Sequence, residues 1–312
     1  MAKGKNRKPQ RANKPRSGQQ RSGQSRSGRG GGGRSNEGGR NRAVRDAGGP
    51  AGSAGEGRRT SGPGGDRIEG RQAVRELLLA DTRQVNEIVM QEGLDTSSIL
   101  EDIELLAGDR GVRIREVGRG AFDSLAQTES AQGVLADAEP LPTVELEDLI
   151  DQPNPFLVMV DSVTDPHNLG AIFRSADAAG ATGIVLPKHR SARIGPTVSK
   201  TAAGAIEHVP IAHVAGVPVA IQTLQKHDVW VIGLDEAAER SIFEFDIADQ
   251  PLCLVLGAEG PGLSRLTRER CDQLVSIPMQ GSVASLNVSA AATVAMFDVA
   301  RRRLGGNEGG NR

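Results

Sequence analysis

Short apolar runs alternate with helical patterns through residues 154–304. The runs are FLVMVDS, GIVLP, WVIGLD, CLVLG and LVSIP. Strands that are apolar at every position are buried on both faces, which requires a parallel sheet covered by helices on each side. The chain has no tyrosine, one tryptophan and six phenylalanines, so aliphatic side chains must build the core. The predicted fold class is therefore α/β.

Helices are predicted between and after these runs from the spacing of their apolar residues. One ends near residue 180, and the others cover residues 196–208, 219–226, a short stretch through 271, and 285–303. The residues after 304 are rich in glycine and asparagine, so 305–312 is predicted to be a flexible tail.

A smaller α/β unit is predicted over residues 66–140. Its pattern gives helices at 71–80, 97–106 and 121–125, and strands at 85–90, 112–117 and 133–138. Four prolines then bracket one acidic helical stretch at 144–150, so residues 141–153 are predicted to link the two units.

The formal charge of −1 conceals two oppositely charged parts. Residues 1–65 carry 16 Lys and Arg against three acidic residues, a net of +13, and the rest of the chain carries −14. The basic arm also holds 18 of the 40 glycines and no aromatic residue, which predicts disorder. Such an arm binds RNA phosphates without sequence preference, or it only keeps the protein in solution.

Several classes of protein are disfavoured by the composition. No apolar run reaches the roughly 18 residues of a membrane span, and the N-terminus lacks the apolar core of a secretory signal. The two cysteines, Cys253 and Cys271, have neither metal-ligand spacing nor a disulfide framework, and His167 and His189 lack partners at ligand spacing. We therefore expect a cytoplasmic protein without a metal.

Polar residues follow the first strand of the larger unit, in the segment VDSVTDPHNLGAIFRSADAAG. Ligands of open α/β sheets bind beyond the carboxyl ends of strands, so this segment is a candidate site. Asn168 is predicted to cap the following helix, and Arg174 lies six positions later on it. Capping alone for Asn168 and a surface ion pair for Arg174 would explain both residues equally well.

Two further segments carry candidate site residues. In LVLGAEGPGLS, the glycines permit close backbone approach to a nucleotide-like ligand, and Glu259 is a charged residue without a packing role. In IPMQGSVASLNVSAAATVAMF, Ser285 and Asn287 are placed in the first helical turn, whose free amides suit an anion. A tight turn and a simple N-cap at Ser285 are the alternative explanations.

The three segments, in this order, resemble the signature motifs of the SpoU (TrmH) family of RNA ribose 2′-O-methyltransferases. The segments GRQAVRELL at 70–78 and QGVLA at 132–136 are similar to the ends of the small L30e-like RNA-binding domain in the branch that methylates a guanosine of large-subunit ribosomal RNA. That branch usually has histidine where this chain has Ala131.

The resemblance implies a trefoil knot at the C-terminal side of the sheet, a homodimer with a site completed from both subunits, and S-adenosylmethionine as methyl donor. It implies that the donor is held by Gly257, Ile277 and Leu286. The polar residues of the family's motifs fall on Asn168, Arg174, Glu259, Ser285 and Asn287.

The chemistry of a ribose hydroxyl explains these residue types. The hydroxyl must lose a proton as it attacks a methyl group in line, and Arg174 is permanently charged, so it cannot be the base. We expect Arg174 to bind the phosphate beside the target and stabilise the developing alkoxide. Further phosphate contacts are expected from the basic residues between the first two motifs, which are Lys188, Arg190, Arg193 and Lys200.

The predicted function is 2′-O-methylation of a guanosine ribose in large-subunit ribosomal RNA. A transfer RNA ribose methyltransferase and a non-catalytic RNA-binding assembly factor are the alternatives, and titration with S-adenosylmethionine separates the latter from an enzyme. The hypothesis of a nicotinamide-dependent oxidoreductase is based on the α/β alternation alone, and the chain lacks the glycine fingerprint of a dinucleotide-binding site.

Overall fold

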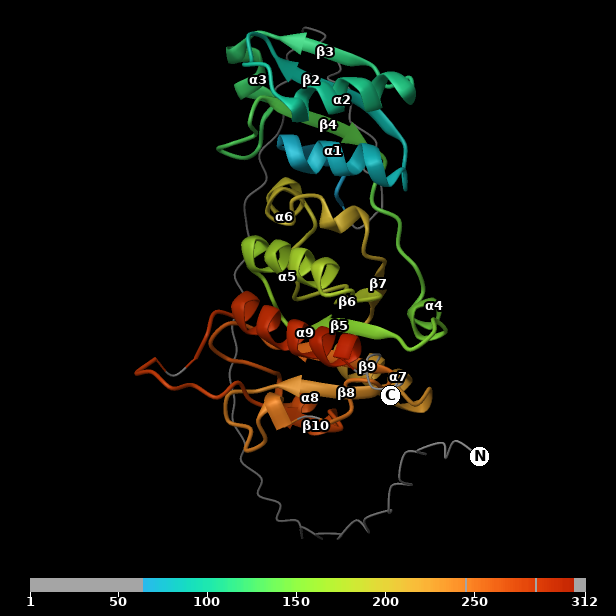
Figure 1. Ribbon diagram of the computed structural model, residues 1–312, viewed down its shortest axis with the longest axis vertical. Coiled ribbons are helices and arrows are strands. Elements are labelled where there is room, and N and C mark those ends of the chain that lie inside the picture. The colour runs from blue at the N-terminus through green and yellow to red at the C-terminus, as the bar shows by residue number, and fades with distance from the viewer. Residues whose placement is uncertain (1–63, 245, 284, 306–312) are drawn as a thin grey trace, which may run out of the picture. The chain divides into compact units, whose positions relative to one another are not determined.

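The computed structural model describes residues 64–244, 246–283 and 285–305 (Figure 1). The predicted disordered arm therefore lies outside the described residues up to position 63, and so does the tail from position 306. Gly64 and Gly65, which the prediction assigned to the arm, pair with the chain at Ile194. The Gly65 amide donates to the Ile194 carbonyl at 3.0 Å.

The first sheet has four strands in the order β1-β4-β2-β3, with β2 and β3 parallel and the other pairs antiparallel. The strands are β1 (Arg67–Glu69), β2 (Val85–Gln91), β3 (Ile114–Val117) and β4 (Val134–Ala138), and the helices are α1 (Arg71–Ala80), α2 (Ser98–Asp109) and α3 (Arg119–Leu125). Every element predicted for this unit is confirmed to within a few residues. Strand β1 was not predicted, because three residues are too few to show a period.

The Gln-Gly pair at 132–133 has a structural role in this unit. Gln132 accepts a hydrogen bond from the Arg71 amide at 3.0 Å through its side chain, and the Arg71 Nε donates back to the Gln132 carbonyl at 3.1 Å. Gln132 thereby supplies the first turn of α1 with an acceptor that Gly70, the residue before the helix, lacks.

The second sheet has six strands, all parallel, in the order β10-β8-β9-β5-β6-β7. The strands are β5 (Phe156–Val160), β6 (Gly183–Pro187), β7 (Ile211–Val214), β8 (Trp230–Leu234), β9 (Leu252–Leu256) and β10 (Gln273–Val275). The predicted parallel sheet is confirmed.

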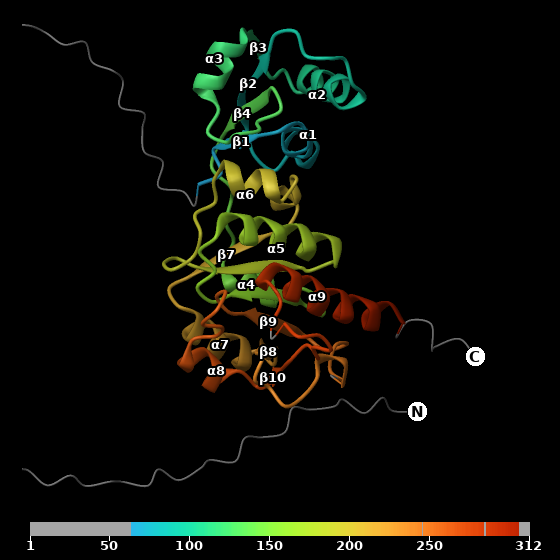
Figure 2. The ribbon, with the colours of Figure 1, turned by 90° about the vertical axis from the view of Figure 1, so that its left-hand side faces the viewer.

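Helices cover both faces of this sheet. The helices are α4 (Leu146–Ile150), α5 (Pro166–Ala178), α6 (Pro196–Thr201), α7 (Val217–Lys226), α8 (Arg265–Arg270) and α9 (Val288–Gly305). Residues of α5, α6 and α9 share one apolar core with the sheet, and residues of α4 and α7 share the other. Helices α5 and α9 lie side by side in both views (Figures 1 and 2).

The prediction of one helix over 196–208 is wrong. Helix α6 ends at Thr201, and a separate 3-10 turn, η1 (Ala205–Glu207), follows it. Ala203 and Gly204 between them have φ angles of 52° and 88°, which a continuing right-handed helix does not allow. Strand β7 was missed as well, because its four residues include His213 and gave no clear period.

Candidate active site

Asn168 is a buried residue inside α5 and not its cap. The cap is Asp165, whose side chain accepts a hydrogen bond from the His167 amide at 3.0 Å, and Pro166 begins the helix. Only 6% of Asn168 is exposed. Because Asp165 satisfies the helix end, the amide of Asn168 is free to bond elsewhere.

The side chain of Asn168 joins two of the other predicted residues. Its Nδ2 donates to Oε2 of Glu259 at 3.1 Å, and its Oδ1 accepts from Nδ2 of Asn287 at 2.9 Å. A carboxylate at one end and an amide donor at the other allow only one orientation of the Asn168 amide. The structure thus brings three of the five predicted polar residues, one from each segment, into a single hydrogen-bonded chain.

Asn287 also caps α9, which begins at Val288 and not at the predicted Ser285. The Oδ1 of Asn287 accepts from the amide of Ser289 at 2.9 Å and from its hydroxyl at 2.6 Å. Ser285 is therefore not the cap and instead lines a pocket. Asn287 uses its oxygen for the helix and its nitrogen for Asn168, so the start of α9 is tied to the polar cluster.

A pocket lies beside this cluster at the carboxyl ends of β8, β9 and β10. Its walls include the three predicted donor-binding residues and two of the predicted polar ones, together with neighbours on the same loops: Leu234, Asp235, Glu236, Leu256, Gly257, Ala258, Glu259, Gly260, Pro261, Gly262, Arg268, Ile277, Met279, Ser285, Leu286, Val288 and Ala291.

Gly257 makes the turn beneath the pocket possible. A β-carbon at this position would lie 2.2 Å from the Gly262 carbonyl carbon and 2.3 Å from the Leu263 nitrogen. Both are backbone atoms, and two hydrogen bonds between Ala258 and Gly262, of 3.0 and 2.9 Å, hold them in place. These contacts form a tight turn, the alternative explanation for the glycines, and the approach of a ligand to this loop stays a prediction.

Asp235 is a pocket residue that the sequence analysis missed. It directly follows β8, is 6% exposed, and forms an ion pair of 2.6 Å with Arg268. Its other carboxylate oxygen accepts from the Ala237 amide at 3.0 Å. An aspartate immediately after the apolar run WVIGL was the available signal, the same one that drew attention to the segment after β5.

Arg174 is not in contact with the polar cluster. Six residues of an α-helix turn the side chain through about 240°, so Arg174 and Asn168 emerge from different faces of α5. Arg174 is exposed, and within the described part of the chain it has neither a hydrogen bond nor an ion pair. Its neighbour Ser175 bonds Thr293 of α9 through their hydroxyls at 2.7 Å, so Arg174 lies near α9.

The four predicted RNA-binding residues flank the end of β6 and α6. Lys188, Arg190 and Arg193 are exposed in the loop after β6, and Lys200 is half-buried on α6. Helix α6 packs tightly on α5, because a β-carbon at Gly170 would lie 2.6 Å from Cβ of Thr201. The basic loop is thus connected to the helix that carries Asn168.

Other reactive groups are few in the part of the chain that the structure describes. No group of three or more His, Cys, Asp or Glu residues there could hold a metal ion, and no helix there is long and apolar enough to cross a membrane. Cys253 and Cys271 are free thiols. Burial raises the pKa of both, that of Cys271 to about 12, so neither is a thiolate nucleophile at neutral pH.

Two family models match the sequence of this chain. Residues 155–297 match the SpoU rRNA Methylase family, and residues 67–144 match the RNA 2′-O ribose methyltransferase substrate binding family. The first match contains every residue of the polar cluster and the three predicted donor-binding residues, and the second contains the four-stranded sheet.

Named proteins resemble the chain over most of its length. It is 40% identical over 245 residues to the 23S rRNA (guanosine-2′-O-)-methyltransferase RlmB of Haemophilus influenzae, covering 77% of this chain and 99% of that protein. The corresponding enzyme of Ralstonia nicotianae is 44% identical over 237 residues, covering 75% and 94%. The crystal structure of the SpoU methyltransferase AviRb from Streptomyces viridochromogenes with AdoMet aligns with a TM-score of 0.65 at 27% identity, covering 77% and 91%.

Proposed function

The chain belongs to the SpoU rRNA methylase family, and on that premise we propose that it methylates the 2′-hydroxyl of a guanosine ribose in large-subunit ribosomal RNA with S-adenosylmethionine. The observation that supports the proposal most directly is the hydrogen-bonded chain from Glu259 through Asn168 to Asn287. Its first member, Glu259, lines the pocket together with Gly257, Gly260 and Gly262. A ribosomal substrate implies a cytoplasmic enzyme.

The pocket residues fit S-adenosylmethionine. Gly257 allows the loop after β9 to fold into the compact turn that forms one wall of the pocket, because a β-carbon there would meet the Gly262 and Leu263 backbone. Ile277 and Leu286 offer apolar surface for an adenine ring, and the carboxylates of Asp235 and Glu259 suit the positive charges of the donor. When bound, the donor supplies a methyl group on a positively charged sulfur. The trefoil knot implied for the loops after β9 and β10 is part of the same proposal.

The polar residues of this chain would position the ribose. Ser285, which lines the pocket, and Asn168 beside it would orient the attacking hydroxyl, and Glu259 fixes the Asn168 amide. Arg174 would bind the adjacent phosphate and stabilise the alkoxide as it forms. The RNA phosphate or a water would accept the proton, because an arginine cannot.

We propose a homodimer in which Arg174 from one subunit completes the site of the other. Arg174 emerges from a different face of α5 than its own Asn168, and its neighbour Ser175 bonds α9, a helix that exposes a stripe of apolar residues. On α9, Val294 is 36% exposed, Phe297 46% and Leu304 73%. Exposed apolar residues on one helix face favour a protein interface, and a two-fold axis through it places the same patch on both subunits.

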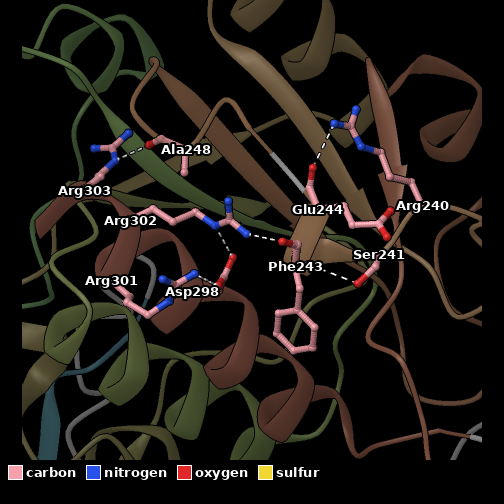
Figure 3. A network of polar contacts seen from close by, with 9 residues as sticks. All are labelled: Arg240, Ser241, Phe243, Glu244, Ala248, Asp298, Arg301, Arg302 and Arg303. Atoms are coloured by element: carbon pink, nitrogen blue, oxygen red, sulfur yellow. Dashed lines mark hydrogen bonds and ion pairs between the residues drawn. The ribbon is translucent and has the colours of Figure 1, made fainter. Parts of the chain in front are cut away.

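A polar network fixes the end of α9 beside this stripe (Figure 3). Asp298 pairs with Arg301 at 2.9 Å and with Arg302 at 2.7 Å, and Arg302 also bonds the Phe243 carbonyl at 2.5 Å. The Phe243 side chain is 52% exposed. The network therefore anchors α9 while an aromatic ring next to it stays available to a second subunit.

One experiment tests the reaction directly. Ribose methylation is mapped in ribosomal and transfer RNA from cells with and without the gene. Loss of one 2′-O-methylguanosine from large-subunit RNA is the expected result, and loss of a transfer RNA site would replace the proposed substrate. If no methyl group disappears, the enzymatic function is wrong.

Mixing two inactive variants tests the shared site. Arg174→Ala and Asn168→Ala lie in different subunits of each proposed site, so the mixed dimer keeps one intact site. Random mixing then restores about a quarter of the wild-type activity. Arg265→Ala, which removes an exposed arginine from α8, is the control and retains full activity. A mixture without activity, from variants that exchange subunits, would place both residues in the same subunit's site.

A further inference from the structure

A second cleft, of about 890 Å³, lies at the carboxyl ends of β6 and β7. Its walls include the loop after β6, with Lys188, Ser191 and Arg193, and the side chain of His213 on β7. Asp66 and Gln127 of the first sheet's unit line it as well. None of these residues lines the pocket assigned to the methyl donor, so the cleft is a separate feature.

The cleft is close to the polar cluster along the same edge of the sheet. All six strands are parallel, so their carboxyl ends share one edge, and β6 and β7 follow β5 in the sheet order. Neighbouring strands lie about 4.8 Å apart, which places the ends of β6 and β7 about 5 and 10 Å from the end of β5. The donor pocket lies on the other side of β5, at the ends of β8, β9 and β10, so the methyl group is further from the cleft than these distances.

The side chains of the cleft suit a nucleotide. Lys188 and Arg193 supply exposed positive charge, and as far as the chain is described no carboxylate pairs with either. Two polar atoms of residues that line the same cleft, Oγ of Ser191 and Nε2 of His213, are buried without a hydrogen-bond partner among the described residues. A buried polar atom without a partner costs about 1–3 kcal/mol, so such atoms are often completed by a ligand or a water.

The imidazole of His213 is suited to a base and not to a phosphate. Burial, and secondly the charge of Lys188, lower the pKa of His213 below its usual 6.5. The ring is therefore neutral at pH 7, with one nitrogen that donates and one that accepts. Such a group can pair with the polar edge of a base, while Lys188 and Arg193 neutralise the phosphate beside it.

The loop that lines the cleft is bonded to the loop that leads to Asn168. The Ala192 amide donates to the Val163 carbonyl at 2.9 Å, two residues before the cap of α5 at Asp165. Further along, Oγ1 of Thr201 on α6 lies 3.3 Å from Nδ1 of His167 on α5. These bonds fix the position of the cleft relative to α5, the helix that carries Asn168, and so fix the position of a bound ligand relative to the polar cluster.

We propose that this cleft binds one nucleotide of the substrate RNA, on the same strand as the methylated ribose and close to it, with its phosphate on Lys188 and Arg193 and its base against His213 and Ser191. The inference rests on the proposed function, and it adds a site that selects the sequence next to the target. His213 is in this view a positioning residue that touches the RNA and not the reacting atoms.

Steady-state kinetics and direct binding test the proposal in the full-length protein. The acceptor is ribosomal RNA from cells that lack the gene, and the donor is tritiated S-adenosylmethionine. The variants are the double change Lys188→Ser with Arg193→Ser, the single change His213→Gln, and their combination. Lys226→Ser, at the exposed end of α7, removes a positive charge away from the cleft and is the matched control.

The expected result is a rise in KM for RNA with donor affinity unchanged. We expect about tenfold for the double variant and about three- to tenfold for His213→Gln, with the control unchanged. Because both sets contact the same nucleotide, the combined variant should lose less than the product of the two effects. RNA containing 4-thiouridine should cross-link to peptides that include Ser191 or His213.

A KM within twofold of the control for every variant, without cross-links in the cleft, overturns the proposal. RNA binding is also measured by fluorescence anisotropy without the methyl donor, which separates this proposal from the methylation itself. Wild-type protein that binds RNA through the cleft but transfers no methyl group would refute the proposed function and leave the nucleotide site standing.

Discussion

Gly257→Ala should abolish most of the affinity for S-adenosylmethionine while leaving the fold in place. The new β-carbon would lie 2.2–2.6 Å from three backbone atoms of Gly262 and Leu263, where ordinary contacts are 3.4 Å or more. The two strands of this turn must therefore separate by about 1 Å, which overpacking data place at about 1–3 kcal/mol.

The strain falls on the turn that lines the pocket, because separating its two sides breaks the paired hydrogen bonds between Ala258 and Gly262. Donor binding requires the turn in its closed form, so we expect this strain of about 1–3 kcal/mol to weaken binding. The dissociation constant for the donor then rises about 5- to 150-fold, since each 1.4 kcal/mol is a factor of ten. Isothermal titration calorimetry measures this constant, and thermal unfolding of the free protein shows whether the fold survives.

The matched control is Gly281→Ala, in the loop before α9. A β-carbon there meets no atom within 4 Å, and Gly281 does not line the pocket. The control should bind the donor like wild type. Wild-type affinity in Gly257→Ala as well would show that the turn does not hold the donor, and would refute the reasoning from close approach.

Three other predictions follow from the charges and hydrogen bonds of the chain. Arg303→Met should lower the free energy of unfolding by about 2–4 kcal/mol in urea titration, because Arg303 donates to four carbonyls, those of Asn154, Pro155, Ala248 and Gln250; a loss below 0.5 kcal/mol would contradict this. The pKa of His213 is lower in the folded protein than in the unfolded chain, so as pH falls the imidazole is protonated in the unfolded chain before it is protonated in the fold. Protonation therefore stabilises the unfolded state, and the free energy of unfolding falls as pH drops below about 6.5. His213→Gln should therefore flatten the pH dependence of unfolding between pH 7.5 and 5.5, and an unchanged slope would count against a buried neutral ring. Deleting residues 1–65, which carry a net charge of +13, should weaken RNA binding and reduce its salt dependence without changing donor affinity; an identical salt slope would leave the arm without an RNA-binding role.

Periodicity was sufficient to predict the larger sheet, because each buried strand is a continuous apolar run bounded by turn residues. It failed where the signal was short or broken. Strand β1 has three residues, and β7 carries His213 in the middle of a four-residue strand. The break between α6 and η1 depends on positive φ angles at Ala203 and Gly204, and an alanine gives no warning of one.

The candidate site was predicted as a set of residues but not as a geometry. Asn168 was expected as a helix cap, and a cap was the alternative explanation for Ser285, but both caps belong to neighbours, Asp165 and Asn287. Sequence spacing cannot choose between adjacent residues that can all cap a helix. Arg174 was expected at the site with Asn168, and the six positions between them on α5 place the two side chains on different faces of the helix.

The double use of Asn287 has a practical consequence for anyone who needs an inactive form of this protein. Truncating a residue that both starts a helix and orients a neighbour in the site confounds the two effects: Ala would remove both, whereas Asp would keep an oxygen for the Ser289 amide and remove only the nitrogen that bonds Asn168. A crystallographer trapping an RNA complex should use Asn287→Asp, because Arg174, although exposed and without a fold contact within the described residues, is the proposed ligand of the RNA phosphate. The helix cap thus decides which inactivating substitution is safe to use.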